Sequence, residues 1–82
     1  MSAKSTVIKR SIVLRGHKTS ISIEDDFWSA LKEMALERQQ TLSAVVEAID
    51  KQRHSGSLSS AIRVFVVRHY RDMSRRDHAS TT

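Results

Sequence analysis

The sequence predicts a small, mainly α-helical protein with one short β-strand per chain, in which two chains associate through that strand. Residues 18–23 alternate between polar and β-branched side chains, which is typical of a strand with one buried face. Apolar residues at helical spacing then recur in three segments that are separated by turn signals. A chain of 82 residues buries only a modest fraction of its surface, and association is a common remedy.

The predicted strand has two distinct faces. Its polar face consists of Lys18, Ser20 and Ser22, and its apolar face consists of Thr19, Ile21 and Ile23. A lone strand leaves its backbone groups unpaired, so it needs a partner strand.

Two partners are available for this strand. One is the weakly alternating run at residues 11–15, reached through a type II′ turn at Gly16-His17. That register sets Arg15 opposite Lys18, and like charges across a strand pair repel. The other partner is the same strand of a second chain, which we favour because no later segment has a strand pattern. Whether residues 11–15 add a further strand stays open.

Each of the three helices has recognisable boundaries. Acidic residues at 24–26 favour the start of the first helix, which should end near Arg38. Thr41 is an N-cap candidate for the second helix, and Gly56 is a good stop for it. Ser57 can cap a third helix, whose apolar residues cover so much of its circumference that we expect it to be heavily buried. Trp28 widens the apolar stripe of the first helix and is expected in the core.

Charge divides the chain into three parts, although the net charge is +5. Residues 1–23 carry five basic residues and no acid, residues 24–50 carry a net −5, and residues 51–82 carry a net +5. Such basic segments attract phosphate. We expect a flexible basic N-terminal arm at 1–10, a folded domain at 11–73 and a frayed tail at 74–82.

Several classes of function are disfavoured by what the sequence contains. There is no cysteine for a disulfide or a thiolate metal site, and no apolar run is long enough to span a membrane, so we expect a cytoplasmic protein. The four histidines are scattered, and none lies near a nucleophile and an acid at a recognisable spacing. We therefore expect no enzymatic activity, no cofactor and no metal.

Two segments of the chain resemble the ribbon-helix-helix family of bacterial DNA-binding proteins. They are Lys18-Thr-Ser-Ile-Ser-Ile-Glu-Asp-Asp-Phe-Trp-Ser-Ala-Leu-Lys-Glu-Met-Ala and Thr41-Leu-Ser-Ala-Val-Val-Glu-Ala-Ile-Asp. The later Leu-Ser-Ser-Ala-Ile-Arg-Val-Phe-Val segment is similar to a subfamily with an added third helix. The resemblance implies an intertwined homodimer with an intermolecular antiparallel β-ribbon, which lies in the major groove of double-stranded DNA, and a repressor-like transcriptional regulator. The family often has glycine shortly before the second helix, where this chain has Gln39-Gln40.

The resemblance also implies a set of site residues. Base contacts fall to Lys18, Ser20 and Ser22. Phosphate contacts fall to the start of the second helix, at Thr41, Leu42 and Ser43, and the flanking Arg10, Arg15 and His17 are further candidates. The expected dimer core is Ile21, Ile23, Phe27, Leu31, Val45, Val46 and Ile49.

The alternative function is that of an antitoxin in a toxin-antitoxin pair, or of a protein-interaction or assembly module. In an antitoxin, residues 57–82 would wrap the toxin partner. A toxin-binding tail that is disordered when alone would be polar, whereas the third helix is strongly apolar. An apolar helix is more typical of self-association, as a homodimer or as a tetramer of paired dimers. We therefore favour the DNA-binding function.

Overall fold

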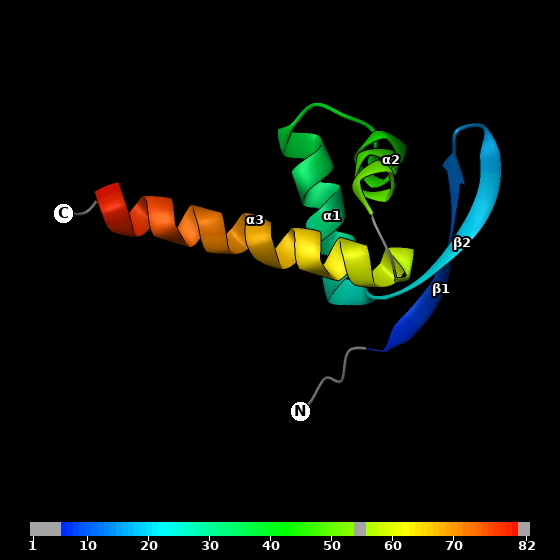
Figure 1. Cartoon of the computed structure of the whole chain (residues 1–82), viewed down its shortest axis with the longest axis horizontal. Helices are drawn as coiled ribbons and strands as arrows, with labels where there is room; N and C mark the ends of the chain where they lie inside the picture. Colours follow the sequence, from blue (N-terminus) through cyan, green and yellow to red (C-terminus); the bar gives the residue numbers. More distant parts are fainter. Residues whose placement is uncertain (1–5, 54–55, 81–82) are drawn as a thin grey trace.

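A two-stranded hairpin lies beside three helices in the computed structural model, which describes residues 6–53 and 56–80 (Figure 1). The order is β1 (Val7–Leu14), β2 (His17–Glu24), α1 (Asp25–Glu37), α2 (Leu42–Gln52) and α3 (Leu58–Ser80). This confirms a mainly helical fold of the ribbon-helix-helix type with a third helix. The second half of α3 projects beyond the other elements.

The strand pairing differs from the sequence prediction, because each chain has two strands and not one. β2 pairs antiparallel with β1 over its whole length, from Leu14 opposite His17 to Val7 opposite Glu24. The connection is Arg15-Gly16, one residue earlier than the turn considered from the sequence. Val13, and not Arg15, therefore faces Lys18, and the predicted charge repulsion does not arise.

The hairpin turn has a left-handed backbone at both of its central residues. Arg15 has φ 51° and Gly16 has φ 81°, which is the pattern of a type I′ turn. This turn type follows the right-handed twist of paired strands. The backbone N–H of Arg15 donates to Glu47 Oε2 at 2.8 Å, which ties the turn to α2.

The helix boundaries agree with the sequence signals. Thr41 Oγ1 accepts from the Ala44 backbone N–H at 3.0 Å, and Ser57 Oγ accepts from the Ser60 backbone N–H at 3.1 Å. Acidic residues occupy the first turn of α1. Local capping chemistry therefore sets where these helices begin.

The core lies between the hairpin and the helices of one chain. Its buried residues, all apolar among those that the structure describes, are Ile12, Leu14, Ile21, Ile23, Trp28, Leu31, Met34, Ala35, Val45, Val46, Ile49, Ile62 and Val66. Six of the seven residues expected in a dimer core belong to this set, and Phe27 is partly buried against it. They lie in the core of one chain, and their expected role in a dimer core stays a prediction.

α3 is less buried than its composition predicts. Ile62 and Val66 lie in the core, but Val64 is 48% exposed and Val67 is 46% exposed. The core covers only one side of the helix.

The predicted ends of the chain are partly folded. Residues 7–10, assigned to the basic arm, lie in β1, and residues 74–80 of the expected frayed tail lie in α3. Residues 1–5, 81 and 82 of the predicted ends fall outside the described part.

Candidate nucleic-acid interface

The face of the hairpin that points away from the helices is polar and basic. Opposite residues of an antiparallel pair point to the same side, so the register assigns four residues of each strand to this face, including Val7 and Glu24 of the end pair. Apart from that end pair, we call Lys9, Ser11, Val13, Lys18, Ser20 and Ser22 the outer face, and all six are exposed. Their neighbours Ile12, Leu14, Ile21 and Ile23 are buried on the opposite side.

Two unpaired lysines give the outer face its positive charge. Neither Lys9 nor Lys18 forms an ion pair in the described part of the chain, and no acid lies among the six residues. Glu24 lies at one end of the hairpin, where Arg63 Nε donates to its Oε1 at 2.9 Å. That hydrogen bond lowers the pKa of the Glu24 carboxyl, so the acid is ionised but already paired. The lysines are therefore left to attract an external anion.

Arg10, predicted to contact phosphate, is turned toward the core. Its guanidinium donates to Asp25 Oδ1 at 2.8 Å and lies 5.3 Å from the centre of the Trp28 ring. Its side chain is only 16% exposed. A phosphate contact by Arg10 would require both of these interactions to break, so the geometry favours a structural role.

Arg15 and His17 lie at the tip of the hairpin. The Arg15 guanidinium donates to Asp50 Oδ2 at 3.0 Å, and Arg53 donates to the other oxygen of the same carboxylate. The hydrogen bonds from Arg15 and then Arg53 lower the pKa of the Asp50 carboxyl. His17 is exposed beside the turn. Arg15 therefore holds the hairpin to α2, while His17 stays accessible.

The start of α2 has the features of an anion-binding helix end. Thr41 caps the Ala44 amide, and the backbone N–H groups of Leu42 and Ser43 belong to the first turn, which has no acceptor inside the helix. No acid lies in this turn to neutralise the positive end of the helix dipole. The capping role of Thr41 is thus observed, and it leaves neighbouring amides for a phosphate.

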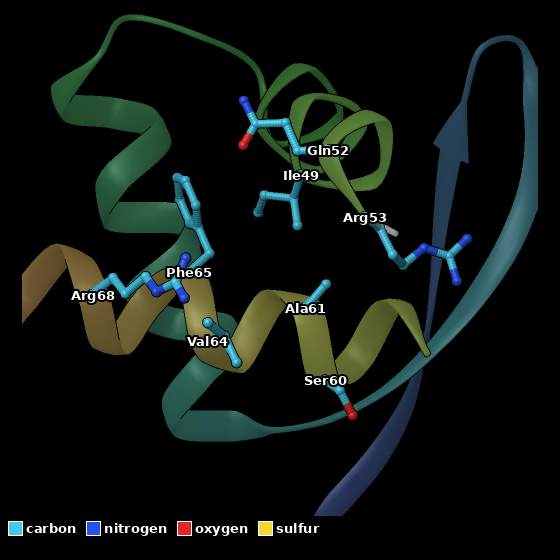
Figure 2. Close-up of a pocket in the computed structure, with 8 residues that line it drawn as sticks. All are labelled: Ile49, Gln52, Arg53, Ser60, Ala61, Val64, Phe65 and Arg68. Atoms are coloured by element: carbon cyan, nitrogen blue, oxygen red, sulfur yellow. The ribbon is translucent and has the colours of Figure 1, made fainter. Parts of the chain in front are cut away.

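A groove lies between the end of α2 and α3. Figure 2 shows Ile49 and Phe65 pointing into this groove, with Arg53 and Arg68 toward its two ends. Its volume is about 270 Å³, and no hairpin residue lines it. Among the described residues, no three metal-ligating side chains come together. The groove is separate from the outer face.

Sequence reasoning found half of the outer face. It identified Lys18, Ser20 and Ser22 from the alternation in the second strand, and the structure brings them together with Lys9, Ser11 and Val13. The signal for the missing half was the weak alternation at residues 11–15, whose side could be assigned only with the turn known. Lys9 was grouped with a mobile arm, although it lies within β1.

A β-ribbon that exposes lysines and hydroxyls, followed by a helix with a free N-terminal turn, defines a nucleic-acid-binding type of architecture. The ribbon-helix-helix domain model matches residues 7–70, and the chain belongs to this family. The family consists of DNA-binding, non-enzymatic domains of the transcription-regulator kind, which generally also dimerise. No curated protein and no solved structure matches the chain. In the described part, no helix combines the length and apolarity needed to cross a membrane.

Proposed function

We propose that this protein is a sequence-specific regulator of transcription, of the repressor type, that places a β-ribbon containing β2 in the major groove of double-stranded DNA. The observation that carries the proposal is the exposed polar face of β2, with Lys18 unpaired and Ser20 and Ser22 beside it. Phosphate contacts come from the first turn of α2, at Thr41, Leu42 and Ser43, and from His17. Arg10 and Arg15 are left out because their guanidinium groups are held in ion pairs.

The dimensions and chemistry of the hairpin suit this role. Two strands about 4.8 Å apart fit a major groove that is about 12 Å wide. A lysine ammonium can donate to guanine O6 and N7, whereas a serine hydroxyl can donate or accept and so discriminates weakly between bases. We therefore expect moderate base preference on top of strong phosphate attraction.

We further propose that the protein acts as a homodimer. The family generally dimerises, and the chain exposes apolar side chains that a second copy could cover, notably Val64 and Val67 on α3. A dimer would carry twice the net charge of +5, which favours binding to a polyanion. The antitoxin alternative is not carried forward, because α3 is a continuous helix that packs on its own chain.

Selection of bound duplexes from a random pool, followed by salt titration on the selected site, tests this function. We expect binding that weakens steeply with salt, with a log–log slope of about −0.9 per phosphate contact. Lys18→Ala should reduce discrimination between selected and unrelated duplexes about tenfold, as for loss of one base contact. Lys32→Ala, which removes an exposed lysine from α1, is the matched control and should leave discrimination unchanged.

Two results would count against the proposal. Absence of duplex binding at low salt would exclude the DNA-binding role itself. Equal loss of affinity on every duplex in Lys18→Ala would demote this lysine from a base contact to a phosphate contact. Sedimentation at micromolar concentration tests the dimer separately, since a monomer there would exclude it.

A further inference from the structure

We infer that the second half of α3 is a second contact for DNA phosphates, so that the protein holds two duplex segments at once. One segment lies on the β-ribbon, and the other lies on Arg68, Arg71 and Arg75, which we call the basic stripe. This inference rests on the proposed DNA-binding function and adds to it a separate, sequence-independent site.

The three arginines of the basic stripe share one side of α3. A spacing of three and then four residues brings side chains to the same face of an α-helix, and all three are exposed. Together with Asp72 they line a hollow of about 250 Å³, which leaves a net charge of +2 around it. Sites that enclose a whole small molecule measure about 300–1,000 Å³, so this smaller hollow suits a single phosphate group.

These arginines are unpaired, unlike those on the body of the protein. The arginines held in ion pairs are Arg10, Arg15, Arg53 and Arg63. Arg38 lies 5.2 Å from the centre of the Phe65 ring. Within the described residues, no ion pair or aromatic contact engages the basic stripe. An unpaired guanidinium presents a planar set of donors that matches the oxygens of a phosphate.

The second half of α3 and the hairpin lie at opposite ends of the molecule (Figure 1). α3 starts beside β2, where Ser59 Oγ donates to the Ser22 carbonyl at 2.6 Å. Arg71 and Arg75 lie about 18 and 24 Å further along the helix axis. The outer face of the hairpin points the other way, and DNA keeps its direction over roughly 150 base pairs. A duplex seated on the outer face therefore does not curve back to the basic stripe across a chain that is 47 Å long.

The elements between these two basic surfaces are acidic. Residues 25–52, which comprise α1 and α2, carry six acids against three basic residues, a net −3. One of the acids reaches α3 where the helix leaves the body, since Glu37 Oε1 lies 3.9 Å from His69 Nε2. Phosphates are repelled from this middle part, so the two basic surfaces act as separate sites.

DNA fits the basic stripe better than an anionic membrane does. A helix that lies on a membrane buries a broad apolar face beside its basic face. From residue 71 to residue 80, the apolar residues are Met73 and Ala79. The basic stripe spans about 10 Å of helix, and the phosphates of one DNA strand recur about every 3.4 Å along the duplex axis. The basic stripe therefore matches a short row of DNA phosphates.

A two-duplex capture assay tests the inference. The selected duplex is immobilised at a length of roughly 30 base pairs, so that it stays straight, and a labelled duplex of unrelated sequence is added with the protein. We expect the wild type to retain the labelled duplex. R71Q/R75Q should lower this retention about tenfold, while it binds the immobilised duplex within about twofold of the wild type.

Two matched variants separate loss of this site from loss of charge or of structure. K32Q/K51Q removes two exposed lysines from α1 and α2, the same charge as R71Q/R75Q removes, and should keep the retention. R71K/R75K keeps the charge with a residue of similar helix propensity, and it should retain the labelled duplex within about threefold of the wild type. Circular dichroism and sedimentation should show unchanged helix content and oligomeric state in all three variants.

Salt titration gives a readout that a purely structural role of these arginines would not change. On the labelled duplex, the log–log slope should be shallower in R71Q/R75Q by about 0.9 for each lost phosphate contact. On the selected duplex alone, the slope should match that of the wild type. Vesicles that contain phosphatidylglycerol, tested in the same buffer, should bind the wild type no better than R71Q/R75Q.

Five results would overturn the inference and leave the DNA-binding function intact. The wild type binds the selected duplex but retains no second one, or K32Q/K51Q loses as much retention as R71Q/R75Q. The slope on the selected duplex alone becomes shallower in R71Q/R75Q, or vesicle binding depends on Arg71 and Arg75. Retention that falls in Lys18→Ala but survives in R71Q/R75Q would assign the second duplex to the ribbon of another dimer. If the wild type binds no duplex at low salt, then the proposed function itself fails.

Discussion

Replacement of Gln39 by glycine should stabilise the protein. Gln39 follows the end of α1 with φ 56°, a left-handed conformation that glycine adopts without strain. Its N–H donates to the Leu36 carbonyl at 3.1 Å, and the Gln40 N–H donates to the Ala35 carbonyl at 2.9 Å. These two bonds form a Schellman motif, in which glycine is the usual residue at the position of Gln39.

Two opposing contributions to the free energy of unfolding set the size of this stabilisation: relief of backbone strain and greater flexibility of the unfolded chain. A non-glycine residue in the left-handed region costs about 1–2 kcal/mol. Glycine gives back roughly 0.4–1 kcal/mol, because it makes the unfolded chain more flexible. The central values of the two ranges differ by about 0.8 kcal/mol, which corresponds to a rise in Tm of roughly 3–6 °C for a domain of this size.

Thermal and urea unfolding, followed by circular dichroism at matched protein concentration, would measure this gain. Gln40→Gly is the matched control, since Gln40 has no positive φ and its replacement adds only unfolded-state flexibility. We expect that control to lose about 0.5 kcal/mol. A Gln39→Gly variant no more stable than the wild type would refute the argument from backbone strain.

Two other predictions follow from the ion pairs. The arginine hydrogen bonds that lower the pKa of Glu24 and Asp50 stabilise the native state at neutral pH, and this stabilisation is lost as the pH falls from about 4 through the lowered native values. The Tm of E24Q/D50N should therefore fall less steeply with acid than that of the wild type, and parallel curves would contradict this. Arg10→Ala should lose about 1 kcal/mol, mainly from its contact with Trp28, without changing the salt slope of DNA binding. A shallower slope would show that Arg10 contacts phosphate.

The helices and the polar face of β2 could be predicted from the sequence because their causes are local. Thr41 and Ser57 cap residues three positions away, and the alternation from Lys18 to Ile23 fixes the sides of the strand whatever its partner. The irregular turn at Gln39 was also visible as a departure from glycine. In each case the interacting groups lie within a few residues, so a pattern in the sequence is enough.

The pairing of β2 could not be predicted, because it depends on contacts that are distant in sequence. An arginine with positive φ is uncommon. At Arg15 this conformation is accompanied by bonds to Glu47 and Asp50, 32 and 35 residues further along the chain. The sequence analysis placed the turn one residue later, at Gly16-His17. In that register Arg15 faces Lys18, and the repulsion between the two positive charges disfavours the hairpin.

The same turn decides the roles of two adjacent basic residues. With the loop at Arg15-Gly16, Lys9 falls on the outer face and Arg10 points inward to Asp25 and Trp28. Because side chains alternate along a strand, a shift of one residue would exchange their sides. Net charge does not distinguish Lys9 from Arg10, but the register leaves Lys9 exposed and holds Arg10 against Asp25 and Trp28. The Lys9→Ala and Arg10→Ala pair therefore tests the hairpin register: we expect the first to weaken binding to duplex DNA at low salt and the second to lower only stability.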